Sequence, residues 1–156
     1  MVVLRRTLQS VALASPAFAA PADASRGERG MGSPQARLTA VELFSLTCPH
    51  CAAFARDSLP ELKAKWIAPG RLRWVFYDFP SDKAALQAAM LAGDAGMDRT
   101  TFDRALADSA LQDWIVQRAL DAEQRWHVDA TPSFVIAGKL YTGAMTAGEF
   151  AIILGR

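Results

Sequence analysis

A short apolar segment that runs directly into a pair of cysteines constrains this chain more than any other feature. The segment Leu38–Leu46 is almost continuously apolar, which is typical of a strand buried on both faces of a sheet. It is followed by Cys48-Pro49-His50-Cys51, with the proline in the first turn of a helix, where its missing N–H has no cost. A buried strand that leads into a helix indicates an α/β fold.

The helix places its first cysteine where a thiolate is favoured. A helix N-terminus offers free N–H groups and a partial positive charge, so we expect the pKa of Cys48 to fall and Cys48 to be the nucleophile. Cys51 follows one turn later and can close a disulfide ring with Cys48. His50 offers a ring N–H or a positive charge close to the Cys48 sulfur, and we expect it to tune that pKa. An exposed helix residue without a role is the alternative for His50.

Metal binding is the other chemistry that a cysteine pair can perform. A structural zinc site needs four ligands, and outside the motif His127 is the only remaining histidine or cysteine. We therefore expect no metal and no cofactor, and we interpret His127 as a helix-end residue whose charge suits the dipole. A Cu(I) carrier that uses Cys48, Cys51 and His50 remains an alternative.

The rest of the chain continues the alternation of helices and strands. Glycines and capping patterns predict where the helices begin and end. The four tryptophans are expected to pack in the core. The predicted elements are a helix from Cys48 through Trp66 kinked at Pro60, a strand over Leu72–Phe79, a helix from Ser81 to Ala95, helices beginning at Thr100 and Ser109, strands over Ser133–Ala137 and Leu140–Thr142, and a helix from Thr146 to Leu154.

Composition excludes several classes of protein. Hydrophobic residues make up 51% of the chain, enough for a core, which excludes wholesale disorder. Lys and Arg number 17 against 16 Asp and Glu, and a net charge of +1 lacks the basic excess of a nucleic-acid-binding protein. No apolar run reaches the roughly 18 residues that a membrane span requires.

The N-terminal part of the chain resembles an export signal. Arg5 and Arg6 precede a mostly apolar stretch, and Ala17-Phe18-Ala19 fits a cleavage site, so we predict a signal peptide over 1–19 and a periplasmic protein. An ordinary disordered tail is the alternative, and translation from Met31 would give a cytoplasmic protein. The small, polar segment 20–36 is predicted to be a disordered linker, and 37–156 the folded domain.

The sequence around the cysteines also resembles a known family. The run VELFSLTCPHC, Val41–Cys51, is similar to the DsbA-like thiol–disulfide oxidoreductases of the thioredoxin superfamily, which typically carry Cys-Pro-His-Cys. The similarity extends from about Gly32 to the C-terminus and includes LPEL at 59–62, DFP at 78–80 and TPSFVI at 131–136. The resemblance implies a thioredoxin-like α/β fold with a redox-active disulfide between Cys48 and Cys51.

Three further residues are assigned by this resemblance. Pro132 matches the proline that the superfamily holds in the cis form facing the disulfide, and Thr131 would offer backbone groups to an extended substrate. An ordinary trans proline at a strand start is the alternative. Glu42 matches a buried acid that relays a proton to the resolving cysteine, and a carboxylate in an apolar strand is costly unless it has a partner or is protonated. An edge-strand residue facing water is the alternative for Glu42.

The chain also departs from the minimal fold. A segment of about residues 81–127 separates the second strand from the cis-proline strand, which indicates a short helical insertion. Relatives often carry a second cysteine pair in this insertion, and Asp94 and Ala105 stand in its places here.

The function implied is oxidation of substrate protein thiols through a mixed disulfide. The expected catalytic residues are Cys48, Pro49, His50, Cys51 and Glu42, and the expected substrate-binding residues are Thr131 and Pro132. The expected partners are reduced substrate proteins and a membrane protein that reoxidises the chain, which we expect to be a monomer that binds no nucleic acid. A reductase or isomerase with the same cysteines is the alternative.

Overall fold

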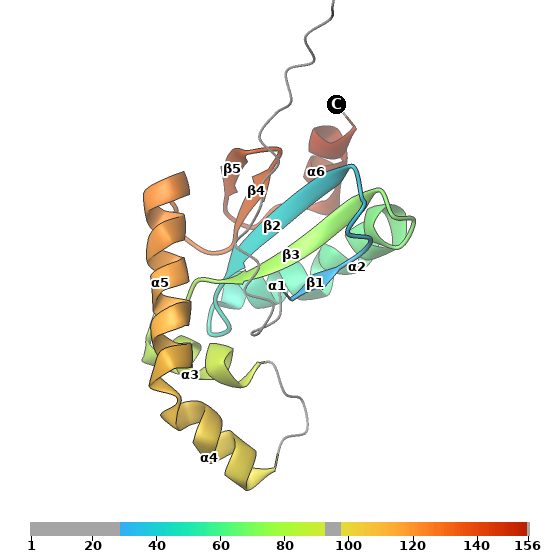
Figure 1. Cartoon of the computed structure of the whole chain (residues 1–156). Helices are drawn as coiled ribbons and strands as arrows, with labels where there is room; N and C mark the ends of the chain where they lie inside the picture. Colours follow the sequence, from blue (N-terminus) through green and yellow to red (C-terminus); the bar gives the residue numbers. More distant parts are fainter. Residues whose placement is uncertain (1–28, 93–97, 156) are drawn as a thin grey trace, which may run out of the picture.

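The computed structural model describes residues 29–92 and 98–155. Within these residues the strands form one five-stranded sheet in the order β1-β3-β2-β4-β5 (Figure 1). Strand β2 runs parallel to β3, and the β1–β3, β2–β4 and β4–β5 pairs are antiparallel. The strands are β1 (Gly30–Met31), β2 (Leu38–Phe44), β3 (Leu72–Asp78), β4 (Ser133–Ile136) and β5 (Lys139–Thr142).

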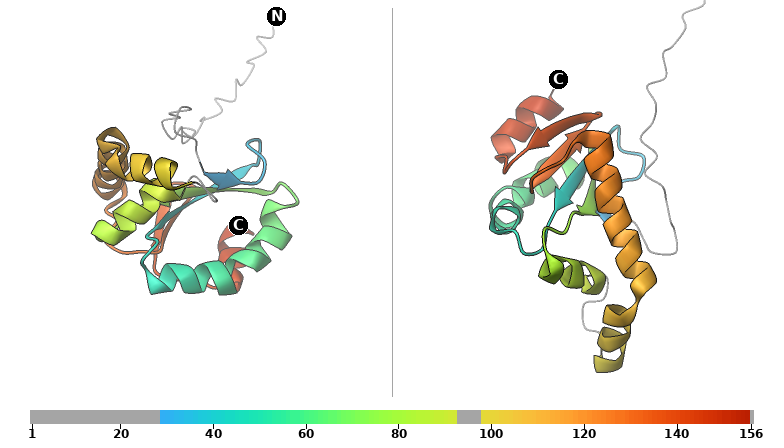
Figure 2. Two further views of the ribbon diagram at one scale, coloured as in Figure 1. Left: turned by 90° about the horizontal axis from the view of Figure 1, so that it is seen from below. Right: turned by 90° about the vertical axis from the view of Figure 1, so that its left-hand side faces the viewer.

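Helices cover both faces of this sheet, which confirms the predicted fold class. Helices α1 (Pro49–Asp57), α2 (Leu59–Leu62) and α6 (Ala147–Leu154) lie on one side, together with the π-helical turn η1 (Lys63–Ile67) (Figure 2). Helices α3 (Lys83–Leu91), α4 (Arg99–Ala107) and α5 (Ser109–Trp126) come between β3 and β4, where the helical insertion is expected. Of these three, α5 packs against the other face of the sheet, while α4 buries none of its residues.

Two apolar clusters hold the layers together, and β2 contributes to both. Its Ala40 faces α1, α2 and α6, and its Val41 and Leu43 face α5. The first cluster contains a group of aromatic residues, and the ring centroids of Phe54 and Trp74 lie 5.8 Å apart. Burial on both faces is what the continuous apolar run predicts. The remaining fully buried aromatic residues of the first cluster are Phe134 and Phe150.

The helix after the cysteines breaks where a kink is predicted. Helix α1 ends at Asp57, and α2 begins at Leu59 with Pro60 in its first turn. Proline has no N–H to donate to the carbonyl four residues earlier, and its ring clashes with that carbonyl, so a new helix start accommodates it better than a kinked interior. The chain then continues through η1 to β3.

Helix starts in the insertion differ from the predicted ones by one or two residues. The caps are Asp82, Asp98 and Asp108, whose carboxylates accept from the N–H groups of Ala85, Thr101 and Leu111. We predict starts at Ser81, Thr100 and Ser109 instead. A carboxylate also interacts favourably with the helix dipole, which favours aspartate over a neighbouring hydroxyl. Helix α3 ends at Leu91, before the predicted end at Ala95, and the Ala92 N–H donates to the carbonyl only three residues earlier, at Ala89. Ala95 and Gly96 themselves lie outside the described residues. The capping box of Thr146 and Glu149 is confirmed.

The segment that precedes β2 is partly ordered. Gly30 and Met31 form β1, which pairs with Val75 and Trp74 of β3, and Arg29 forms an ion pair with Asp78. The last part of the linker predicted over 20–36 therefore lies against the sheet, because its backbone completes the edge beside β3. The predicted signal peptide over 1–19 lies outside the described residues. None of the helices within residues 29–92 and 98–155 is long and apolar enough to cross a bilayer.

Gly32 allows this segment to approach the sheet closely. Its φ is +89°, and a Cβ placed there would lie 2.6 Å from the Leu72 carbonyl oxygen. We expect Gly32→Ala to lower the free energy of unfolding by about 2 to 3 kcal/mol, from left-handed backbone strain plus the steric clash. Gly70→Ala is the matched control, because Gly70 has a φ of +76° and nothing within 4 Å of its Cβ position.

Gly70→Ala should cost only the backbone strain, about 1 kcal/mol. Urea denaturation of the three proteins measures the difference. If the two variants lost the same free energy of unfolding, the steric clash with the Leu72 carbonyl would contribute nothing to the effect of Gly32→Ala.

Candidate active site

The two cysteines occupy different environments at the start of α1. Strand β2 ends at Phe44, and a tight turn follows in which the Cys48 N–H donates to the Ser45 carbonyl at 3.1 Å. Cys48 is the N-cap of α1, as predicted, and Pro49 is its first residue. Both sulfurs are free thiols, and Cys48 is partly exposed whereas Cys51 is only 4% exposed.

The surroundings of Cys48 favour its thiolate. Its partial burial opposes ionisation, but hydrogen bonds from the Thr131 hydroxyl and from the backbone N–H groups of Cys51 and His50 outweigh that effect. The pKa of Cys48 therefore lies below the usual value of a thiol. This direction agrees with the expectation from the helix N-terminus.

The surroundings of Cys51 favour its protonated form. Burial, together with the charge of the neighbouring Cys48, raises the pKa of Cys51 to about 12, although the backbone N–H of Ser45 opposes the rise. Cys48 therefore ionises more readily than Cys51. The two sulfurs differ both in exposure and in acidity.

The Thr131–Pro132 segment lies directly against Cys48. The bond between the two residues is cis, as the resemblance implies, and the Cys48 thiol donates to the Thr131 carbonyl at 3.3 Å. Pro132 is fully buried, and its carbonyl accepts from the Gly143 N–H at 2.9 Å. The fold thus brings together two motifs that are more than eighty residues apart in the sequence.

Glu42 is a buried acid in a central strand. It is 3% exposed, which excludes the alternative of an edge-strand residue facing water. The indole Nε1 of Trp74 donates to its carboxylate at 2.9 Å. Burial raises the pKa of Glu42 to about 7, and the Trp74 hydrogen bond limits the rise. Trp74 stacks on Phe54, one turn after Cys51 in α1, so the acid lies on the face of the sheet that α1 covers.

Both histidines of the chain are exposed. His50 is exposed, and its backbone N–H is the group that acts on Cys48. His127 is exposed at the C-cap of α5, with a φ of +55°, which agrees with its interpretation as a helix-end residue. Among the described residues, no three His, Cys, Asp or Glu side chains cluster in a way that could hold a metal ion.

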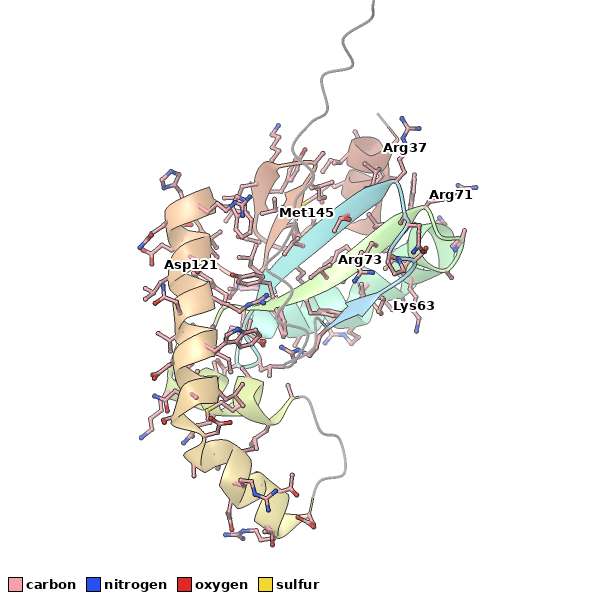
Figure 3. All side chains as sticks on the ribbon, viewed as in Figure 1. Arg37, Lys63, Arg71, Arg73, Asp121 and Met145 are labelled. Atoms are coloured by element: carbon pink, nitrogen blue, oxygen red, sulfur yellow. The ribbon has the colours of Figure 1, made fainter. Side chains whose placement is uncertain are left out.

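A hollow of about 670 Å³ lies at the other end of the sheet. Arg37 and Arg71, which are labelled in Figure 3, precede β2 and β3. Both line this hollow, together with Trp66 and Tyr141. The cysteines follow the opposite end of β2. The cysteine pair therefore lies away from this hollow.

Sequence reasoning missed two residues of the site. Trp74 is expected only as a core residue, and its hydrogen bond to Glu42 joins residues 32 positions apart. Ser45 is not singled out at all, although its backbone contacts both cysteines. A serine at the end of an apolar strand is a weak signal, because such residues commonly start turns.

Comparisons with known proteins place the chain in a family. The family model described as thioredoxin matches residues 24–99 and 91–155. The thiol:disulfide interchange protein DsbA of Bordetella parapertussis is 25% identical over 187 residues, covering 92% of this chain and 88% of that protein. A protein-disulfide oxidoreductase of Rickettsia prowazekii is 40% identical over 62 residues. That match covers 40% of this chain but only 23% of the Rickettsia protein, so the chain spans about a quarter of that relative's length.

Solved structures agree on the fold. The α-DsbA1 of Wolbachia pipientis superposes with a TM-score of 0.77 at 22% identity, over 83% of this chain and 89% of that one. A protein-disulfide isomerase of Novosphingobium aromaticivorans gives 0.74 at 23% identity, over 84% of this chain and 99% of that one. Because the family model spans the described residues, the chain belongs to the thioredoxin family.

Proposed function

We propose that this chain is a protein thiol:disulfide oxidoreductase that oxidises thiols of substrate proteins. The observation that carries the proposal is the unequal cysteine pair beside Thr131 and the cis Pro132. The names of the Bordetella and Rickettsia relatives support the same reaction class. Structural zinc needs four ligands, and in the part of the chain that the structure describes no three His, Cys, Asp or Glu side chains cluster.

The reaction proceeds by two thiol–disulfide exchanges. A substrate thiolate attacks Cys48 of the oxidised pair, the Cys48–Cys51 bond breaks, and a Cys48–substrate disulfide forms as Cys51 takes up a proton. A second substrate thiolate then attacks the substrate sulfur of that disulfide, and Cys48 leaves as a thiolate. Two electrons pass from the substrate dithiol to the chain. The lowered pKa of Cys48 makes it a good leaving group in the second exchange.

Glu42 is proposed to supply the proton that Cys51 needs. A sulfur whose pKa is about 12 is a poor leaving group unless it is protonated as it leaves. An acid whose pKa is about 7 is well suited to exchange a proton near neutral pH. Its position beneath α1, linked through Trp74 and Phe54, supports this role.

Thr131 and Pro132 are proposed to bind the substrate. Thr131 is partly exposed beside Cys48, and its backbone can pair with an extended segment in the manner of an added strand. Pro49 is proposed to favour the start of α1 directly after Cys48, because proline has no N–H that would lack a hydrogen-bond partner in the first turn.

The lowered pKa of Cys48 supports the oxidising direction. Stabilising the Cys48 thiolate stabilises the reduced protein, which makes the disulfide a stronger oxidant. An isomerase is the second candidate, because the Novosphingobium neighbour carries that name. The two activities use the same sulfurs and differ in the reduction potential of the pair.

The location and partners are proposed from the sequence pattern of the N-terminus and from the relatives. An exported, periplasmic, monomeric chain would meet reduced proteins as its substrates and would depend on a membrane partner for reoxidation. The net charge of +1 does not favour nucleic acid as a partner.

A peptide assay tests the proposed function. The oxidised chain is mixed with a reduced peptide that contains two cysteines, and peptide disulfide is followed together with the redox state of Cys48 and Cys51. We expect stoichiometric transfer, and a reduction potential well above that of thioredoxin in glutathione buffer. A potential as low as that of thioredoxin would favour a reductase, and absence of transfer would refute the proposal.

His50 is expected to contribute to that potential through its side chain. Replacing it with leucine removes a donor and a potential charge near Cys48, while the exposed position limits any effect on packing. We expect His50→Leu to raise the pKa of Cys48 and to lower the reduction potential by about 30 mV for each pKa unit. Thiolate absorbance titration and glutathione equilibration measure both quantities. Unchanged values would leave only the His50 backbone as a contributor.

A further inference from the structure

A chain of hydroxyl groups joins the turn before Cys48 to the beginning of the helical insertion. The Ser45 hydroxyl oxygen lies 3.2 Å from that of Thr47 and 3.0 Å from that of Ser81. The Thr47 hydroxyl donates to the Asp82 carboxylate at 2.9 Å. Ser81 and Asp82 stand directly before α3, which Asp82 caps.

The direction of each hydrogen bond follows from counting protons. Thr47 has one hydroxyl proton and gives it to Asp82, so it must accept from Ser45. Ser45 then has no proton left for Ser81 and must accept from it. The three hydroxyls thus form one ordered series that ends on a carboxylate, and charged acceptors make stronger hydrogen bonds than neutral ones.

Ser45 is the residue through which this series reaches the sulfurs. It is 2% exposed, so its hydroxyl depends on Thr47 and Ser81 as partners. Its carbonyl accepts from the Cys48 N–H at 3.1 Å, and its own N–H acts on the Cys51 sulfur. Both cysteines are therefore held by one buried residue whose side chain is fixed partly by the insertion.

We propose that Ser45, Thr47, Ser81 and Asp82 are positioning residues that couple the start of the helical insertion to the redox state of Cys48 and Cys51. The proposal rests on the proposed function and adds to it. In the intact series the Ser45 backbone is fixed where it supports the sulfurs of the reduced protein. Breaking the series frees the turn, so the reduced form loses stabilisation and the pair becomes a weaker oxidant.

The test uses the equilibrium with glutathione, in which one protein disulfide and two glutathione thiols give one protein dithiol and one glutathione disulfide. Thr47→Val removes the hydroxyl at an exposed position, and Ser81→Ala removes the first donor of the series. We expect each variant to lower the equilibrium constant about threefold to tenfold, the value of one hydrogen bond. The pKa of Cys48, measured by thiolate absorbance titration, should be higher in both variants.

Two controls separate positioning from folding. Thr47→Ser keeps the hydroxyl and should restore the constant to within about twofold of the original value. Thr100→Val makes the same change at an exposed position of α4 and should leave it unchanged. A wild-type constant in Thr47→Val and Ser81→Ala, or a Thr47→Ser variant as impaired as Thr47→Val, would overturn the proposal.

The peptide assay and the glutathione measurements distinguish a failure of the proposed function from a failure of the proposed coupling. If the unmodified chain fails to oxidise the two-cysteine peptide, the proposed function fails, and the glutathione constants of the variants still decide whether the hydroxyl series acts on the sulfurs. If the chain oxidises the peptide and the variants match it in glutathione, the coupling alone is refuted.

Discussion

Cys48→Ser should reduce the oxidation of a two-cysteine peptide to the uncatalysed background, whereas Cys51→Ser should trap a covalent complex. Cys48 is the partly exposed sulfur beside the Thr131 carbonyl, and without it no substrate sulfur can join the chain. Cys51 is 4% exposed and has a pKa of about 12, so it reacts poorly with external partners. Its loss leaves the Cys48–substrate disulfide without an internal thiol that could release it.

Acid-quenched, non-reducing electrophoresis measures the trapped complex. For this trap the peptide is supplied in its disulfide form, so that the Cys48 thiolate attacks one peptide sulfur and the other peptide sulfur leaves as a thiol. The Cys51→Ser protein should then accumulate a reducible species with the mass of chain plus peptide, and Cys48→Ser should show none. In the reduced wild-type chain, alkylation at pH 6 should modify Cys48 at least about tenfold faster than Cys51, because thiolates react and thiols do not. Equal alkylation of the two sulfurs, or trapping by Cys48→Ser, would reverse the assignment.

Features encoded within a few neighbouring residues could be predicted from the sequence. Cys48 as the N-cap of α1 and the capping box of Thr146 and Glu149 each depend on a single helical turn, where backbone geometry decides the contacts. The burial of β2 on both faces followed from its apolar run. The cis form of Pro132 came from the family resemblance rather than from any local pattern, and the structure agrees with it.

Features that depend on distant residues could not be predicted in the same way. The Glu42–Trp74 and Ser45–Ser81 hydrogen bonds span 32 and 36 positions and exist only because β2, β3 and α3 meet in the fold. Competing local signals account for other misses. Asp82 beside Ser81 is one case, since both residue types cap helices well and the two are neighbours in the sequence.

Glu42→Gln should stabilise the protein at pH 8 by on the order of 2 to 3 kcal/mol and leave it unchanged near pH 4. The pKa of Glu42 is about 7 in the folded protein against 4.5 for the unperturbed group. Between these values the unfolded chain releases the proton while the folded protein retains it, so stability falls as pH rises from about 4.5 to about 7. Each pKa unit corresponds to about 1.4 kcal/mol, which sets the upper limit near 3 kcal/mol.

Glutamine keeps the carbonyl oxygen that accepts from the Trp74 indole but carries no ionisable proton, so the variant lacks this loss of stability. Urea denaturation of both proteins in the same redox state, at intervals from pH 4 to pH 8, measures the difference in unfolding free energy. Asp82, Asp98 and Glu149, whose pKa values are lowered by hydrogen bonds at helix starts, titrate in both proteins and cancel in the difference. A difference that stays constant with pH would mean that Glu42 is ionised in the folded protein throughout the range, and the proton donor proposed for Cys51 would have to be another group.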